Sequence, residues 1–281
     1  MLVLTVLFFV FENFRPFYYY AGMLVLAFMG YFNGFVTART LKYFGTTDWV
    51  FSAATSSLVF PTWLYATVAI ADVVEWIDDG YVIRLSAAIG FGLLWLAINT
   101  PLCFLGAYKG YVTGDVRSSR AIGKIKKTIP EQPWFMNQAI VVPLFGAIQF
   151  GSFFAEFQYV MHSVWAGQMY AMFAMLLLNF SLLLALISLL SILQTYMQLS
   201  HQNWDWWWRS FFTGGSSVLY CGLYSLYYMW NFMDLDYFGS DLVYLLYMYM
   251  FLLSWFLMTG TVSVLASYVF VTNIYRDIKS D

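Results

Sequence analysis

The sequence predicts an all-α fold, namely a polytopic bundle of membrane-spanning helices. Of the 281 residues, 62% are apolar, 22% aromatic and only 10% charged, whereas soluble domains carry roughly 25% charged residues. A compact soluble fold of this length could not bury so many apolar side chains behind so few ionisable groups. The apolar residues also form long runs rather than the alternating segments of about 10 residues that build a transmembrane β-barrel. These observations exclude a soluble enzyme, a disordered tail and a disulfide scaffold.

Seven apolar stretches are long enough to cross a bilayer, which requires about 20 mostly apolar residues. They are 17–37, 49–71, 86–108, 138–161, 167–197, 210–231 and 242–272. Residues 1–10 form only half a span, and no Lys or Arg precedes them as in a signal peptide. We therefore expect one membrane domain over 1–281. It comprises a partial span and lumenal loop (1–16), a seven-helix bundle (17–272) and a cytosolic tail (273–281).

The basic residues are divided unequally between the two sides of the membrane. The side that holds the C-terminus carries eleven of the thirteen Lys and Arg residues, and the other side carries only Arg15 and Arg84. Because basic loop residues remain in the cytosol, the C-terminus is predicted to be cytosolic. Six of the basic residues lie in the longest cytosolic loop, 109–137. We expect them to fix the topology, and attraction of anionic lipid is the alternative.

One carboxyl group, that of Glu156, lies well inside an apolar stretch. A charge in hydrocarbon costs at least about 2.5–3.5 kcal/mol, so this group must face the protein interior, find a partner or stay protonated. Gln149, Ser152, Tyr159 and Ser163 share its helix face, at spacings of three and four residues. The next stretch carries a second polar face: Ser181, Ser188, Ser191, Thr195 and Gln198. Glu156 either lines a proton or ion pathway or is a buried carboxyl that hydrogen-bonds neighbouring helices.

Small residues recur at every fourth position along three of the stretches. The three lines are Gly30, Gly34 and Ala38; Thr213, Ser217, Cys221 and Ser225; and Thr259, Ser263 and Ser267. Lipid provides no hydrophobic drive between helices, so close backbone approach through small residues supplies their association. We expect most of these residues to pack within the bundle. Any that face lipid would dock another protein's helix, and the candidates are Gly30, Gly34, Thr213 and Ser217.

Four motifs occur in a fixed order along the chain. They are GYFNGFVTAR at 30–39, PLCFLG at 101–106, IPEQPWFMN at 129–137 and WWWRSF at 206–211. On these motifs, the chain resembles the transmembrane 9 superfamily (the nonaspanins) from about residue 20 to its last residue. The resemblance implies nine spans after a large lumenal domain, with a cytosolic C-terminus. The lumenal domain and first span are missing here, so we expect a truncated gene product or an incomplete gene model.

The resemblance also implies a function. It points to a Golgi or endosomal membrane protein that assists the sorting and membrane localisation of other transmembrane proteins and recognises cargo helices within the bilayer. Lys279 and Asp281 resemble the Lys-x-Asp ending that the COPI coat reads for Golgi retention. A transporter or channel that uses Glu156 and the polar faces is the alternative. A seven-helix receptor would need a ligand pocket that the sequence does not identify.

No enzyme signature is present in the sequence. It contains no HExxH, no CxxC pair, no P-loop, no GxSxG and no GxGxxG motif. The two histidines, His162 and His201, fall on opposite sides of the membrane and therefore cannot share a metal ion. We expect a non-enzymatic protein without a cofactor, whose partners are the lipid bilayer, transmembrane cargo proteins and the COPI coat, and not nucleic acid.

Overall fold

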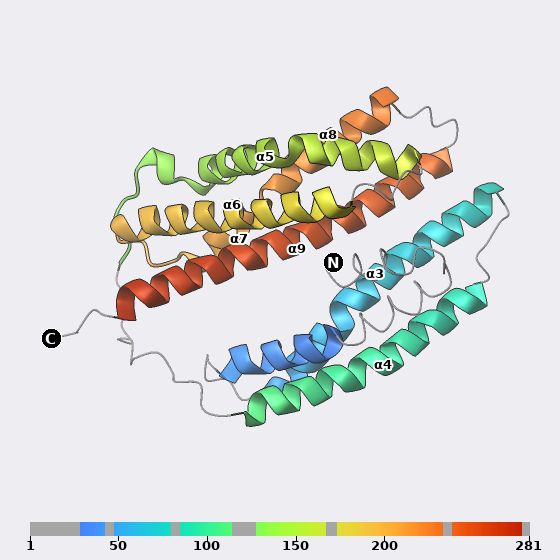
Figure 1. Cartoon of the computed structure of the whole chain (residues 1–281), viewed down its shortest axis with the longest axis horizontal. Coiled ribbons are helices and arrows are strands. Elements are labelled where there is room, and N and C mark those ends of the chain that lie inside the picture. The colour runs from blue at the N-terminus through green and yellow to red at the C-terminus, as the bar shows by residue number, and fades with distance from the viewer. Residues whose placement is uncertain are drawn as a thin grey trace. The chain divides into compact units, whose positions relative to one another are not determined.

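The computed structural model (Figure 1) describes residues 29–42, 48–79, 85–113, 128–166, 173–232 and 238–276. Within these ranges the chain is all helical, as predicted. A helix over 29–42 is followed by α3 (Trp49–Asp79), α4 (Leu85–Val112), the short 3-10 helix η1 (Trp134–Met136), α5 (Gln138–Ala166), α6 (Phe173–Ser200), α7 (Trp207–Gly215), α8 (Ser217–Phe232) and α9 (Phe238–Arg276). The partial span at 1–10 and the beginning of the stretch 17–37 lie outside the described residues.

Four of the described helices are long and apolar enough to cross a membrane. The qualifying segments are Trp49–Ala71, Gln138–Gln158, Asn179–Ser200 and Gly239–Tyr275. They fall within α3, α5, α6 and α9, each at a position where the sequence predicts a span. The all-helical membrane fold is therefore confirmed, while the count of seven full spans and the single domain over 1–281 stay predictions.

The stretch 210–231 is not one continuous helix, contrary to the sequence prediction. It divides at Ser216 into α7 and α8. The Ser216 hydroxyl donates to the Thr213 carbonyl over 2.6 Å, and hydroxyls that bond to nearby carbonyls compete with the helical ladder. Two weak helix formers, Gly214 and Gly215, precede the break. Hydropathy alone does not detect such an interruption.

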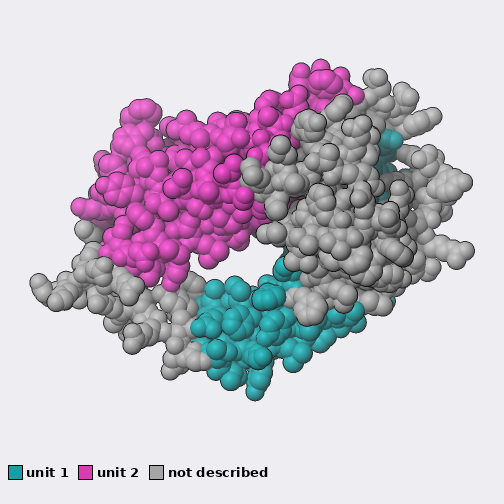
Figure 2. Space-filling model, in the orientation of Figure 1, with its two compact units in different colours: residues 1–125, 237–247 teal, residues 126–236, 248–281 magenta. Residues whose placement is uncertain are grey.

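The chain divides into two compact units, which Figure 2 distinguishes by colour. Unit 1 comprises residues 1–125 and 237–247, and unit 2 comprises 126–236 and 248–281. The boundary thus falls within α9.

In unit 1 the helix over 29–42 packs closely on α4 through small residues on both helices. A Cβ atom added at Gly34 would collide with the backbone of Cys103, and one added at Gly106 with the backbone of Tyr31. Close approach of this kind is the usual means of helix association in lipid. Three fully buried alanines form the adjoining core: Ala38, Ala53 and Ala107. The first two sequence motifs, 30–39 and 101–106, therefore meet in unit 1.

In unit 2 α5 packs against α7 and α8. The Tyr220 hydroxyl donates to the Pro143 carbonyl over 2.9 Å, and a Cβ atom at Gly146 would press on Ser216. Aromatic rings fill the space beside these contacts, with ring centroids 5.6–6.4 Å apart: Phe150, Phe153, Phe157, Tyr224 and Trp255. Along the opposite part of unit 2, α6 and α9 run side by side (Figure 1).

Candidate functional site

Of the predicted polar face of α5, Gln149 is directed at α7, whereas Ser152 is exposed. Gln149 is fully buried, and its Nε2 donates to the Thr213 carbonyl over 3.0 Å. The Ser152 hydroxyl donates to the Gln149 carbonyl of its own helix over 2.6 Å. The Gln149 Oε1 finds no hydrogen-bond partner among the described residues. Gln149 therefore links α5 to α7, whereas the Ser152 hydroxyl forms a hydrogen bond within α5.

Glu156 is half-buried, one helical turn beyond Phe153 in the aromatic region of unit 2. One of its carboxyl oxygens, Oε2, is buried and has no hydrogen-bond partner in the described part of the chain. The side chain of Tyr159 lies outside the described residues. An intramembrane polar site formed by Glu156, Gln149, Ser152 and Tyr159 therefore stays a prediction, and Glu156 is its central residue.

The most connected polar group in unit 2 is a hydroxyl cluster formed by Ser191 and Thr195 of α6, Ser210 of α7, and Ser263 and Ser267 of α9. All five side chains are buried. Ser191 Oγ donates to the Ser263 carbonyl over 2.6 Å and lies 3.0 Å from Ser210 Oγ. Thr195 Oγ1 donates to Ser267 Oγ over 2.8 Å, and Ser267 Oγ also lies 2.7 Å from Ser210 Oγ. Ser191 and Ser267 hydroxyls bond each other as well. The cluster therefore joins three helices.

The chemistry of the hydroxyl cluster favours helix packing. Its hydrogen bonds join hydroxyl and backbone carbonyl groups, and interhelical bonds of this kind hold membrane helices together. Among the described residues there is no group of three His, Cys, Asp or Glu residues that could hold a metal ion. The sequence shows Ser191 and Thr195 on one polar face and Ser263 and Ser267 on one small-residue line. Ser210 belongs to neither pattern, and in the sequence only the motif 206–211 includes it.

All four residues predicted to dock a foreign helix lie in contacts within their own unit. A Cβ atom at Gly30 would collide with the Asn99 side chain, and one at Gly34 with the Cys103 backbone. Thr213 and Ser217 are buried. A docking role for these residues would require the contacts to separate, and it stays a prediction. The predicted sorting signal, Lys279 and Asp281, lies outside the described residues.

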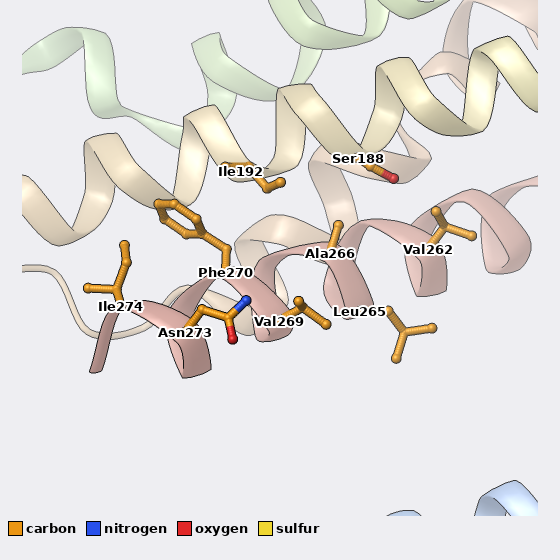
Figure 3. Close-up of a pocket in the computed structure, with 9 residues that line it drawn as sticks. All are labelled: Ser188, Ile192, Val262, Leu265, Ala266, Val269, Phe270, Asn273 and Ile274. Atoms are coloured by element: carbon orange, nitrogen blue, oxygen red, sulfur yellow. The ribbon is translucent and has the colours of Figure 1, made fainter. Parts of the chain in front are cut away.

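The open face of α6 and α9 carries a groove of about 650 Å³ (Figure 3), whose lining residues belong to unit 2. Its nine lining residues are Ser188, Ile192, Val262, Leu265, Ala266, Val269, Phe270, Asn273 and Ile274. Seven of them are apolar, and Leu265 is 59% exposed in the structure. Figure 3 shows Ile192 of α6 and Phe270 of α9 between the two ribbons. The groove thus offers an apolar surface along about a third of α9.

The third and fourth sequence motifs, 129–137 and 206–211, meet in unit 2. Arg209 Nη1 donates to the Met136 carbonyl over 3.4 Å. Gln132 Nε2 donates to the His201 carbonyl over 3.2 Å, and the Phe135 ring contacts the imidazole of His201 edge-on, with centroids 5.9 Å apart. The extended segment before α5 is therefore anchored to the loop between α6 and α7.

These features define the class of the protein: a multi-pass helical membrane protein whose polar residues hold its helices together. Residues 1–239 match the family model described as Endomembrane protein 70, and the chain belongs to this family. It is 32% identical over 267 residues to transmembrane 9 superfamily member 9 of Arabidopsis thaliana, covering 93% of this chain and 41% of that protein. The resemblance inferred from the motifs is thereby confirmed.

Animal members of the transmembrane 9 superfamily are similar to the chain to about the same extent. Human transmembrane 9 superfamily member 4 is 30% identical over 255 residues, which are 90% of this chain and 40% of that protein. Mouse member 2 is 32% identical over 254 residues, which are 88% and 38% of the two chains. The chain therefore spans about two fifths of the length of these relatives. No solved structure matches it.

Proposed function

We propose that this chain assists the sorting and membrane localisation of other transmembrane proteins in the Golgi or endosomes, and that it binds a cargo helix along the α6–α9 groove. The observation that carries this proposal is the open apolar groove of unit 2. The sorting role is proposed from the family resemblance, and the groove is the surface on which a cargo helix would bind. No catalytic step is part of the proposal.

The dimensions and chemistry of the groove suit a single apolar helix. From Val262 to Ile274 it follows α9 for thirteen residues, which span about 18 Å at a rise of 1.5 Å per residue. This is more than half of the roughly 30 Å hydrocarbon core. Ala266, in the middle, permits close approach of a partner helix, and Asn273, near the end, offers an amide for hydrogen bonding. Packing and interhelical hydrogen bonds are the forces that associate helices in lipid.

Filling the groove tests the proposal. Ala266→Phe places a ring in the middle of the groove, whereas Ala155→Phe adds the same ring to an exposed position on α5 that does not line it. The reporter is a membrane protein with a single glycine-rich span, measured by co-purification and by delivery to the cell surface. We expect Ala266→Phe to lower both several-fold and Ala155→Phe to change neither. Equal co-purification and equal surface delivery of the reporter with both variants would refute cargo binding in this groove.

The proposed location in the Golgi or endosomes depends on the C-terminal tail. Replacing Lys279 and Asp281 with alanine removes the predicted coat-binding signal. We expect the double variant to move from the Golgi to later compartments, as followed by fluorescence microscopy of tagged protein. A Ser280→Ala variant keeps both charged residues and serves as the control. Unchanged location of the double variant would refute the signal.

A second candidate function, ion or proton transport, is favoured by one observation. The Glu156 Oε2 atom is buried without a hydrogen-bond partner among the described residues, as expected of a carboxyl that exchanges a proton or binds an ion. Proton flux into liposomes that contain the purified chain, driven by a pH gradient, tests it. Flux that the Glu156→Gln variant abolishes would support transport. Cargo binding without flux would support sorting.

A further inference from the structure

A second, more enclosed cavity lies in unit 2 where the sequence motifs 129–137 and 206–211 meet. Its volume is about 210 Å³, and its walls come from η1, the start of α5, the end of α6 and the start of α7. It does not share a lining residue with the α6–α9 groove. Because it lies at helix ends on the side predicted to be cytosolic, we place it near the bilayer interface.

Two glutamines give the cavity unsatisfied hydrogen-bond acceptors. Gln194 and Gln198 lie one turn apart on α6 and line it. They are only 4% and 3% exposed, and the Oε1 atom of each is buried without a partner among the described residues. Buried polar atoms are normally hydrogen-bonded. These two oxygens therefore indicate a missing partner that donates hydrogen bonds.

Arg209 gives the same cavity a cation. Its guanidinium donates to the Met136 carbonyl over 3.4 Å, and in the described part of the chain no carboxylate forms an ion pair with it. A guanidinium has five N–H donors, so this bond leaves others available for an anion, and phosphate is a preferred partner. The remaining wall is largely apolar and includes Leu144, Phe145 and Met197.

We propose that this cavity binds the headgroup of a phospholipid in the cytosolic leaflet. The headgroup carries O–H or N–H donors, as inositol and ethanolamine do. Arg209 contacts the phosphate, and the Oε1 atoms of Gln194 and Gln198 accept hydrogen bonds from the headgroup. Basic pockets between membrane helices on the cytosolic side are suited to such headgroups. The volume is many times the roughly 10–15 Å³ that a single water requires in a cavity. It therefore holds a headgroup and leaves the acyl chains in the bilayer.

The test compares headgroups that differ in their donors. The full chain is placed in phosphatidylcholine nanodiscs that contain equal small amounts of phosphatidylinositol or phosphatidylethanolamine, and native mass spectrometry counts the lipid that remains bound. Phosphatidylcholine has the same phosphate, but its trimethylammonium group donates no hydrogen bond. We expect retention of the two donor-bearing lipids over phosphatidylcholine. Equal retention of all three lipids by the unmodified chain would overturn the proposal without recourse to any variant.

Variants of the lining residues then test whether the preference for donor-bearing headgroups arises in the cavity. Gln194→Met and Gln198→Met keep the side-chain length and remove the acceptors, and each is expected to lower the preference about fivefold. Gln158→Met changes an exposed glutamine of α5 outside the cavity and should have no effect. Arg209→Gln should weaken retention of all three phospholipids. A Gln194→Met/Gln198→Met double variant with the original preference would overturn the proposal.

The same experiment distinguishes a lipid from a soluble ligand or from water. Glycerophosphoinositol, which has the headgroup but no acyl chains, is added at the concentration of the lipid. We expect it to leave the bound lipid in place. Displacement of the lipid would assign the cavity to soluble phosphodiesters and overturn the lipid assignment. Failure of the chain to retain any lipid would show that the cavity holds only water.

Discussion

Gly34 lies directly against the main chain of Cys103, so closely that a Cβ atom at position 34 would collide with the Cys103 carbonyl. The reciprocal contact, of Gly106 with the backbone of Tyr31, lies about one turn away on the same pair of helices. Two sequence motifs separated by about 60 residues therefore form a single packing surface in unit 1. This relationship explains why glycine occurs at both positions.

A bulky side chain at position 34 should destabilise the protein. Gly34→Ala forces the helices apart and is expected to lower the free energy of unfolding by about 1–3 kcal/mol, and Gly34→Leu should lower it further. Gly151 is the matched control, because a Cβ atom added there meets no other atom within 4 Å. Denaturant titration in detergent micelles measures the difference. Equal stability of Gly34→Leu and Gly151→Leu would contradict the packing role.

The hydroxyl cluster should stabilise unit 2 through coupled hydrogen bonds. Ser210 and Ser267 belong to different helices, with their hydroxyl oxygens 2.7 Å apart. Interhelical bonds in membrane proteins contribute about 0.6 kcal/mol on average and at most about 1.7 kcal/mol. We expect Ser210→Ala and Ser267→Ala each to lower stability by such an amount. In a double-mutant cycle the two losses should not be additive.

Ser152 provides the control for this cycle. Among the described residues its hydroxyl bonds to a carbonyl of its own helix, and the side chain is exposed. Ser152→Ala should leave stability unchanged within a few tenths of a kcal/mol and should show no coupling to Ser267→Ala. Additive effects of the Ser210 and Ser267 substitutions would show that the cluster does not act as one network.

The unpartnered carboxyl oxygen of Glu156 predicts an unusual response to substitution. Since Oε2 has no hydrogen-bond partner among the described residues, Glu156→Gln removes no described bond of this atom and also removes the cost of a charge in hydrocarbon. The free energy of unfolding should therefore be unchanged or higher. Glu131→Gln, at an exposed position before α5, is the control. A loss above about 1 kcal/mol would show that Glu156 has a structural partner.

The positions of the helices could be predicted from the sequence, but their contacts could not. The stretch 138–161 coincides closely with α5, and 49–71 lies within α3, because a long apolar run in lipid must satisfy its backbone within one helix. The direction of each helix face was harder to predict. Lipid is as apolar as the protein interior, so apolar periodicity does not mark the buried side.

The polar residues illustrate this limit. The polar faces on 138–161 and 167–197 each bond to a different helix: Gln149 bonds to Thr213 of α7, and Ser191 bonds to Ser263 of α9. Sequence spacing identifies which residues share a face, whereas the choice of partner depends on how separate helices come together. The cavity beside Arg209 was not predicted for the same reason: the sequence places Gln198 on a polar face, but not that α5 and α7 enclose it together with Gln194.

Site-specific photocrosslinking tests the central claim, cargo binding in the α6–α9 groove, most directly. A photoreactive residue replaces Leu265, which is 59% exposed in the groove, or Leu223, which is 65% exposed on α8 and does not line it. Membranes that contain a reporter with one glycine-rich span are then irradiated. We predict an adduct between position 265 and that span, with little from position 223. Equal labelling from both positions, or labelling from position 223 alone, would contradict the claim.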